Sequence, residues 1–242
     1  MRKQLLAERL LAVRRGDQGL LDGLPEDLVP RNWSEVREIQ EYLMQFLGPV
    51  GGYKVGSAGP DGAISLAPLP ASGIVSSGAR LTGWHQRWVE AEIAVRLAHD
   101  LPARDAAYTD AEVLAAVGSV HPVIEVLNSR FRDPTRIDAL SLGADLIMHG
   151  GLVVGAATAM PDLVAESVRV LVDGVEASRG QGHPAGDLPR LLRYLADHAG
   201  GLRAGQIITT GSWNPVTIPG ENSEVAVKFA RAGEVTVEFR AQ

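Results

Sequence analysis

One segment of the chain alternates between apolar and mostly polar side chains: Arg87-Trp88-Val89-Glu90-Ala91-Glu92-Ile93-Ala94-Val95-Arg96-Leu97. This period of two predicts a β-strand whose apolar residues share one face. Glu90 and Glu92 then lie on the opposite face, about 7 Å apart along the strand. Water would solvate two such carboxylates on an exposed edge, but in the interior they need a cation. The segment therefore raises the question of whether the rest of the chain completes a metal site.

Length and composition narrow the class of protein. The 242 residues contain 45% hydrophobic and 21% charged side chains and show no linker-like stretch, which favours one large globular domain. The net charge of −6 offers no basic surface for nucleic acid. The chain has no cysteine, which excludes disulfides and thiolate metal sites and fits a cytoplasmic location. No apolar run is long enough to span a membrane, and the charged N-terminus lacks a signal-peptide core.

Strands and scattered helices alternate along the chain, which predicts an α+β class. Helices are expected over 1–15, from a cap at Asn32 or Ser34 to Leu47, from Thr109 to Val117, and over 188–199. Further strands are expected over 52–56, 122–127, 150–157 and 205–212, and in a terminal hairpin of 225–229 and 235–239. The strand expected over 168–172 enters another hairpin at the Asp173-Gly174 turn. Residues 57–73, rich in Gly, Pro and Ser, are expected to be irregular. We divide the chain into an N-terminal helical segment, 1–50, and a β-rich catalytic part, 51–242, within one structural unit.

A third carboxylate stands out in the strand predicted at 122–127. That strand is apolar at most positions, so it is expected to be buried on both faces, and Glu125 within it needs a partner. A salt bridge with Arg130 or Arg132 is one explanation, and a shared cation is the other.

Several motifs, taken in order, resemble one known superfamily. They are Gly52-Tyr53-Lys54-Val55-Gly56, Val89-Glu90-Ala91-Glu92-Ile93-Ala94 and Ile124-Glu125-Val126-Leu127-Asn128-Ser129-Arg130. The stretches 34–40, 202–212 and 233–239 extend the match over nearly the whole chain. Together they resemble the fumarylacetoacetate hydrolase superfamily, and within it the group of 2-keto-4-pentenoate hydratases and 4-oxalocrotonate decarboxylases.

The resemblance implies a large mixed, rolled β-sheet with peripheral helices. It also implies that Glu90, Glu92 and Glu125 bind Mg²⁺ or Mn²⁺ and that Lys54 is catalytic, by neutralising charge or relaying protons. The substrate would be a 2-keto acid, whose enolate the cation stabilises. Candidate substrate contacts are Arg130, Asp145 and Ser212, although Arg130 could instead pin the end of its strand.

The match fails around the substrate pocket. The hydratases carry an acid before the glycine that aligns with Gly73, and none stands here. The group's Ala-Asp-Asn-Ala-Ser run corresponds to Ala144-Asp145-Leu146-Ile147-Met148, which keeps Asp145 but replaces the asparagine and serine. His149 follows this run, and a lone histidine such as His121 or His149 more often packs or caps than catalyses.

Three functions remain open at this point. The first is a hydro-lyase adding water to a 2-keto (2-hydroxy) enoic acid in aromatic catabolism. The second is a decarboxylase or an acylpyruvate hydrolase on the same scaffold, the hydrolase being disfavoured because residues 57–73 contain no histidine. The third is a non-catalytic keto-acid-binding partner of a decarboxylase. The resemblance further implies a homo-oligomer and association with a paired decarboxylase.

Overall fold

The strand predicted at residues 87–97 lies at the centre of a seven-stranded mixed sheet in the computed structural model, which describes residues 1–241. In spatial order the strands are β2 (Ile64–Pro70), β1 (Val50–Ser57), β12 (Ile207–Thr209), β5 (Trp88–Leu97), β7 (Val117–Leu127), β8 (His149–Val154) and β3 (Ile74–Ser76). The pairs β1–β12 and β3–β8 are parallel, and the others are antiparallel. The α+β class and the mixed sheet are confirmed.

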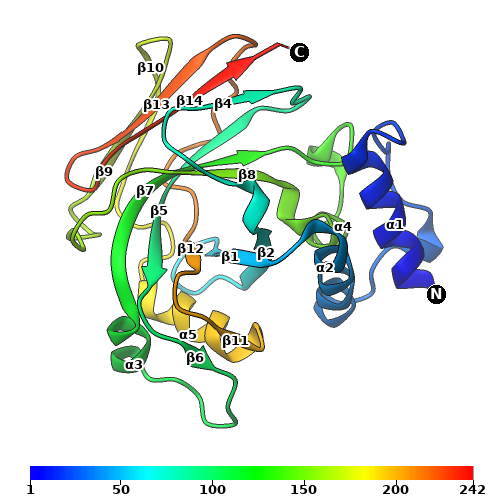
Figure 1. The fold of residues 1–242 in the computed structure, drawn as a ribbon, viewed down its shortest axis with the longest axis horizontal. Coiled ribbons are helices and arrows are strands. Elements are labelled where there is room, and N and C mark those ends of the chain that lie inside the picture. The colour runs from blue at the N-terminus through cyan, green and yellow to red at the C-terminus, as the bar shows by residue number, and fades with distance from the viewer. Residues whose placement is uncertain (242) are drawn as a thin grey trace.

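A five-stranded sheet packs beside the first, and the two curved sheets are visible in Figure 1. Its order is β10 (Val175–Gln181), β9 (Ser167–Val172), β13 (Glu224–Phe229), β14 (Gly233–Arg240) and β4 (Ala79–Thr82). Both predicted hairpins are confirmed within it. Asp173 and Gly174 turn the chain between β9 and β10, and both have the positive φ that a tight hairpin turn requires. A small ladder joins β6 (Leu101–Pro102) to β11 (Gly201–Leu202).

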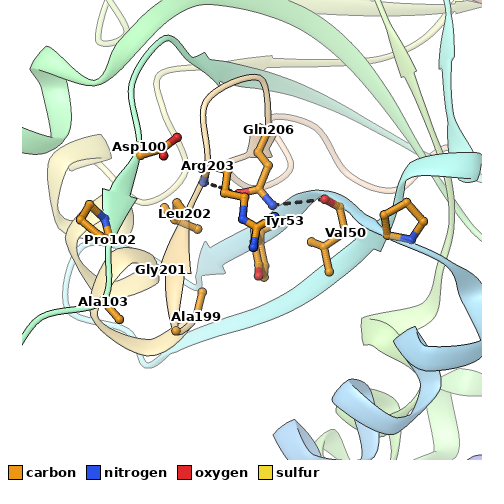
Figure 2. Close-up of a pocket in the computed structure, with 12 residues that line it drawn as sticks. Val50, Tyr53, Asp100, Pro102, Ala103, Ala199, Gly201, Leu202, Arg203 and Gln206 are labelled. Atoms are coloured by element: carbon orange, nitrogen blue, oxygen red, sulfur yellow. Dashed lines mark hydrogen bonds between the residues drawn. The ribbon is translucent and has the colours of Figure 1, made fainter.

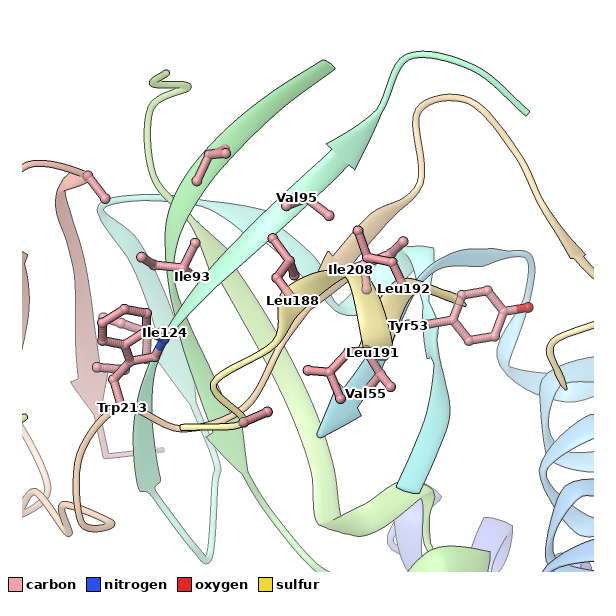
Figure 3. Close-up of a cluster of buried hydrophobic side chains, with 14 of the residues drawn as sticks. Tyr53, Val55, Ile93, Val95, Ile124, Leu188, Leu191, Leu192, Ile208 and Trp213 are labelled. Atoms are coloured by element: carbon pink, nitrogen blue, oxygen red, sulfur yellow. The ribbon is translucent and has the colours of Figure 1, made fainter. Parts of the chain in front are cut away.

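The apolar face of β5 forms part of the main hydrophobic core. Helix α5 (Leu188–His198) begins with Asp187 capping the amide of Arg190 and lays its leucines on the sheet. Figure 3 shows Leu188 and Leu192 towards Val95 and Ile208, and Leu191 beside Val55. Because this face of β5 is apolar and covered, the two glutamates must point to the other side of the sheet.

The N-terminal helices form a second apolar cluster, at the side of the molecule opposite β9 and β10 (Figure 1). Helix α1 (Arg2–Arg15) packs on α2 (Trp33–Leu47), and Asn32 caps α2 by accepting from the amide of Glu35. Other short helices are α3 (Asp110–Ala115), α4 (Ala139–Ala144) and the 3₁₀ turns Glu26–Leu28, Ala71–Gly73, Pro134–Arg136 and Leu146–Met148. The division near residue 50 falls where β1 begins, and it stays a proposal. Among the described residues, no helix has the length and apolarity needed to cross a membrane.

Two local predictions are wrong. Residues 57–73 are not irregular throughout, because β2 occupies Ile64–Pro70 and pairs with β1. Pro68 and Pro70 argued against a strand in this segment, because proline lacks the N–H donor. The strand β2 lies at the sheet edge, where that missing donor is tolerated. The helix expected to reach Val117 ends at Ala115, and Val117 begins β7. Val117 belongs to the strand instead, because sheet pairing overrides the weak helical pattern at that position.

Candidate metal centre

Three carboxylates converge on one face of the central sheet. Glu90 of β5 and Glu125 of β7 are directly opposed in the antiparallel register, and Glu92 lies two residues along from Glu90. One oxygen from each side chain lies within 4.8 Å of the other two. Glu92 is 2% exposed and Glu125 0%, whereas Glu90 is half-buried. The three residues predicted as ligands are therefore brought together in a buried cluster.

Lys54 reaches this cluster from β1. Its Nζ donates to Glu125 Oε1 at 2.7 Å and to the carbonyl of Ile147 at 3.2 Å. Strands β12 and β5 lie between β1 and β7, so in a flat sheet about 14 Å would separate the two backbones. The contact between Lys54 and Glu125 exists because the sheet curls. The curl places the Lys54 ammonium beside the carboxylates.

Glu92 is fixed by the strand between β1 and β5. Thr209 of β12 donates its hydroxyl to Glu92 Oε2, and the amide of Gly211 donates to the same oxygen at 2.7 Å. Gly211 has φ of +105°, a conformation that suits glycine. These two donors orient the carboxylate, and the sequence alone did not single out Thr209 or Gly211 for this role.

His149 is a third residue whose role the sequence did not reveal. It is the first residue of β8, it is 0% exposed, and its Nδ1 lies 3.1 Å from Glu125 Oε1. Burial lowers the pKa of His149 below its usual value, and the Glu125 carboxylate only partly opposes this. The one sequence signal was its position directly after the altered run 144–148.

The charges in the cluster perturb one another. Burial raises the pKa of Glu90 to about 7, and the charge of Lys54 only partly offsets this. Burial and the charges of Glu125 and Glu90 raise the pKa of Glu92 to about 8. Burial also disfavours ionisation of Glu125, but Lys54 and His149 together bring its pKa below the usual value. When all three carboxyls are ionised, three carboxylates and one lysine leave an excess of negative charge that a divalent cation would neutralise.

The donor set fits a hard cation. Glu125 Oε2 is buried and has no hydrogen-bond partner among residues 1–241, although its other oxygen receives two donors. An unpartnered buried carboxylate oxygen is costly unless a ligand satisfies it. Carboxylate oxygens suit Mg²⁺, which keeps open positions for water or substrate, and Mn²⁺ prefers the same ligands.

A cavity of about 200 Å³ opens beside the cluster. Its lining residues are Lys54, Val55, Gly56, Ser57, Ser65, Glu90, Glu92, Ile147, Gly211 and Ser212. Ser212, a predicted substrate contact, is among them, but Arg130 and Asp145 are not. Asp145 instead accepts from Arg130 Nε, from the Arg130 amide at 2.9 Å and from Ser129 Oγ at 2.8 Å. Both side chains of this pair are almost fully buried, so the pair anchors the end of β7 rather than facing the cavity.

A larger cavity of about 570 Å³ lies elsewhere, and Tyr53 lines it (Figure 2). Tyr53 precedes Lys54 in β1, so the two side chains point to opposite faces of the strand. Figure 2 shows the side-chain amide of Gln206 donating through Nε2 to the carbonyl of Val50 at the cavity wall. The carboxylate cluster does not line this larger cavity, so the volume of a cavity does not by itself identify the candidate metal centre.

Comparison with known sequences finds several enzymes to which part of the chain is similar. It is 29% identical over 168 residues to 2-hydroxyhexa-2,4-dienoate hydratase of Comamonas testosteroni, a match covering 66% of this chain and 62% of that protein. It is 31% identical over 167 residues to 2-keto-4-pentenoate hydratase of Paraburkholderia xenovorans (strain LB400), covering 65% and 60%. It is 28% identical over 159 residues to 4-oxalocrotonate decarboxylase of Pseudomonas putida, covering 62% and 59%. The chain thus matches about three fifths of the length of these relatives.

Solved structures share the fold over the whole chain. The 4-oxalocrotonate decarboxylase from Pseudomonas putida G7, complexed with magnesium and adipate, superposes with a TM-score of 0.83 at 20% identity, covering 100% of this chain and 98% of that one. At this identity the likeness establishes the fold. The sequence profile described as fumarylacetoacetate (FAA) hydrolase C-terminal matches residues 37–241. Since that profile spans most of the chain, the protein belongs to the fumarylacetoacetate hydrolase family.

Proposed function

We propose that the protein is a divalent-metal-dependent hydro-lyase that adds water to a 2-keto (2-hydroxy) enoic acid. The observation that carries this proposal is the unpartnered Glu125 Oε2, within a cluster that also contains Glu90 and Glu92 and beside Lys54. Membership of the family, and hydratases among the similar proteins, support it.

In this proposal Glu90, Glu92 and Glu125 hold Mg²⁺ or Mn²⁺. When bound, the cation supplies Lewis-acid polarisation of the keto oxygen of the substrate. Lys54 lines the cavity and carries an ammonium whose charge would attract the substrate carboxylate and whose protons are available for transfer. Burial alone would lower the pKa of Lys54, but the charges of Glu125, Glu90 and Glu92 raise it. Ser212 lies in the cavity wall and is the proposed polar contact for the substrate.

The cavity favours a substrate with one carboxylate over a dicarboxylate. Lys54 is the one cationic side chain among the described residues that line it, and it is already paired with Glu125. The second carboxylate of 4-oxalocrotonate would therefore find no further positive partner among these lining residues. Decarboxylases are about as similar to this chain in sequence as hydratases, so decarboxylation is the second candidate.

Loss of ultraviolet absorbance of 2-hydroxypenta-2,4-dienoate, with Mg²⁺ or Mn²⁺ present, tests the proposal directly. The isosteric double change Glu90→Gln with Glu92→Gln should lower the rate by on the order of 100-fold or more, since Lewis-acid stabilisation contributes several kcal/mol. Glu224→Gln, an exposed change on β13, is the matched control and should leave the rate unchanged.

Undiminished turnover in the double variant, or in chelator-treated protein, would reject the metal-dependent mechanism. Carbon dioxide release from 4-oxalocrotonate without hydration would favour the decarboxylase. Metal-dependent binding of a keto acid without any turnover would favour a non-catalytic partner. We further propose a cytoplasmic homo-oligomer that associates with a decarboxylase, and light scattering of the protein alone and of a mixture tests both forms of association.

A further inference from the structure

A strained turn leads into the metal centre. Leu146, Ile147 and Met148 have φ values of 53°, 52° and 61°, so three consecutive non-glycine residues adopt the left-handed conformation. Each such residue costs roughly 1–2 kcal/mol, and the β-branched Ile147 is especially unsuited to it. Strain of this kind persists only where the surrounding structure enforces it, and it clusters at functional sites.

The surroundings hold both ends of this turn. Before it, the Asp145 carboxylate is bound by Arg130 and Ser129. After it, the carbonyl of His149 accepts from Arg14 at 2.9 Å and from Arg130 at 3.2 Å. With both ends fixed, the backbone between Asp145 and His149 has little freedom to relax.

The turn delivers two groups to the cluster. The carbonyl of Ile147 accepts from Lys54 Nζ at 3.2 Å, which helps to hold the ammonium beside Glu125. The buried ring of His149 brings Nδ1 to within 3.1 Å of Glu125 Oε1. Lys54 and His149 therefore converge on the same oxygen of Glu125.

We propose that His149 is a positioning residue that holds Glu125 with Oε2 free to bind the cation. Two donors, Lys54 Nζ and His149 Nδ1, occupy Oε1, while Oε2 is buried without a partner among residues 1–241. A carboxylate held by one oxygen through two elements cannot rotate without losing both bonds. His149 thus acts on the cation through Glu125, as groups behind metal ligands commonly do.

The hydrogen bond fixes which nitrogen of His149 carries the proton. An ionised carboxylate only accepts, so Nδ1 must be the donor. Nε2 is then a bare acceptor, and it has no hydrogen-bond partner within the described chain. It lies beside Gly73, where an added Cβ would stand 3.6 Å away. In the neutral ring this tautomer supplies the hydrogen bond without adding charge that would repel the cation.

The inference rests on the proposed metal site, but not on the hydratase reaction, and Mn²⁺ titration monitored by electron paramagnetic resonance tests it. His149→Leu removes the donor and should weaken Mn²⁺ binding about 10–100-fold. His149→Asn places an amide N–H near the position of Nδ1 and should stay within about threefold of the unchanged protein. His121→Leu is the matched control, because His121 is a buried histidine of β7 that contacts Ser119 and Gly155 instead of the cluster.

Each outcome bears on one claim. If the unchanged protein fails to bind Mn²⁺, the proposed metal site is wrong. If that protein binds and His149→Leu binds equally well, or if His149→Asn is as weak as His149→Leu, the positioning role is wrong. Should His149→Leu fail to fold, ¹⁵N spectra of histidine-labelled unchanged protein still decide: an Nδ1–H tautomer at His149 supports the inference, and an Nε2–H tautomer overturns it.

Discussion

Replacement of Lys54 by methionine should strongly destabilise the metal-free protein. The Nζ–Oε1 distance is 2.7 Å, with the Lys54 side chain 12% exposed and that of Glu125 0%. Removing one partner of a buried ion pair costs about 3–5 kcal/mol, because the remaining charge stays buried. For a protein of this size, 1 kcal/mol shifts Tm by roughly 2–4 °C, so the expected decrease is roughly 6–20 °C.

Thermal unfolding in the presence of a chelator measures this effect. The matched control is Lys228→Met, which removes an exposed lysine paired with Glu234 at 3.0 Å. Exposed pairs contribute about 0–1 kcal/mol, so the control should shift Tm by no more than about 4 °C. Adding Glu125→Gln to Lys54→Met should recover much of the loss, since no unpaired carboxylate remains.

Equal shifts for Lys54→Met and Lys228→Met would refute the reasoning. Such a result would mean that Lys54 is solvated and that the curl of the sheet does not bring it to Glu125. A double variant no more stable than Lys54→Met alone would show that lost packing, rather than the isolated charge, destabilises the protein.

Three further outcomes are expected. The pKa values of Glu90 and Glu92 are raised to about 7 and 8, whereas burial lowers the pKa values of His149 and His183 below 6.5. Between about pH 6.5 and 8 the two glutamates dominate, so the folded metal-free protein binds more protons than the unfolded chain. Its Tm should therefore fall as the pH rises through this range, and a divalent cation should restore it most at pH 8; a Tm that rises would contradict the shifts. Asp145→Ala should lower stability by about 3–5 kcal/mol in urea unfolding, whereas Asp22→Ala, at an exposed pair, should cost under about 1 kcal/mol; similar losses would disprove a buried anchor. Thr209→Val should weaken Mn²⁺ binding about 5- to 150-fold in calorimetry, because Glu92 loses a donor worth about 1–3 kcal/mol, and unchanged affinity would exclude that role.

Strict periodicity made the central strand predictable. The alternation around Glu90 and Glu92 assigned each side chain to a face, and the structure confirms those faces. The terminal hairpin and the Asp173–Gly174 turn were equally predictable, because alternating runs and turn residues are local signals in the sequence. Strand β2 could not be predicted in this way, because prolines are tolerated only in a strand at a sheet edge. The position of β2 at the edge is a tertiary property that the local sequence does not indicate.

The sequence allowed the metal-binding candidates to be identified, but it did not allow most of their contacts in the folded site to be predicted. Glu90 and Glu92 were identified because the alternation places both on one face of a strand, and Glu125 because a glutamate in a buried strand is anomalous. Thr209 and His149 were not assigned roles, because their contacts with Glu92 and Glu125 join strands far apart in the sequence. The pairing of Arg130 with Asp145 likewise joins the segment after β7 to the C-terminal end of α4, a tertiary contact that no local pattern indicates.

A crystal structure with Mn²⁺ and oxalate, a stand-in for the enolate of a 2-keto acid, tests the central claim most directly. The account predicts an anomalous Mn²⁺ peak bonded to one oxygen each of Glu90, Glu92 and Glu125, with Oε2 as the Glu125 ligand and oxalate in the remaining positions. A peak at another site, or none among these carboxylates at saturating Mn²⁺, would contradict it.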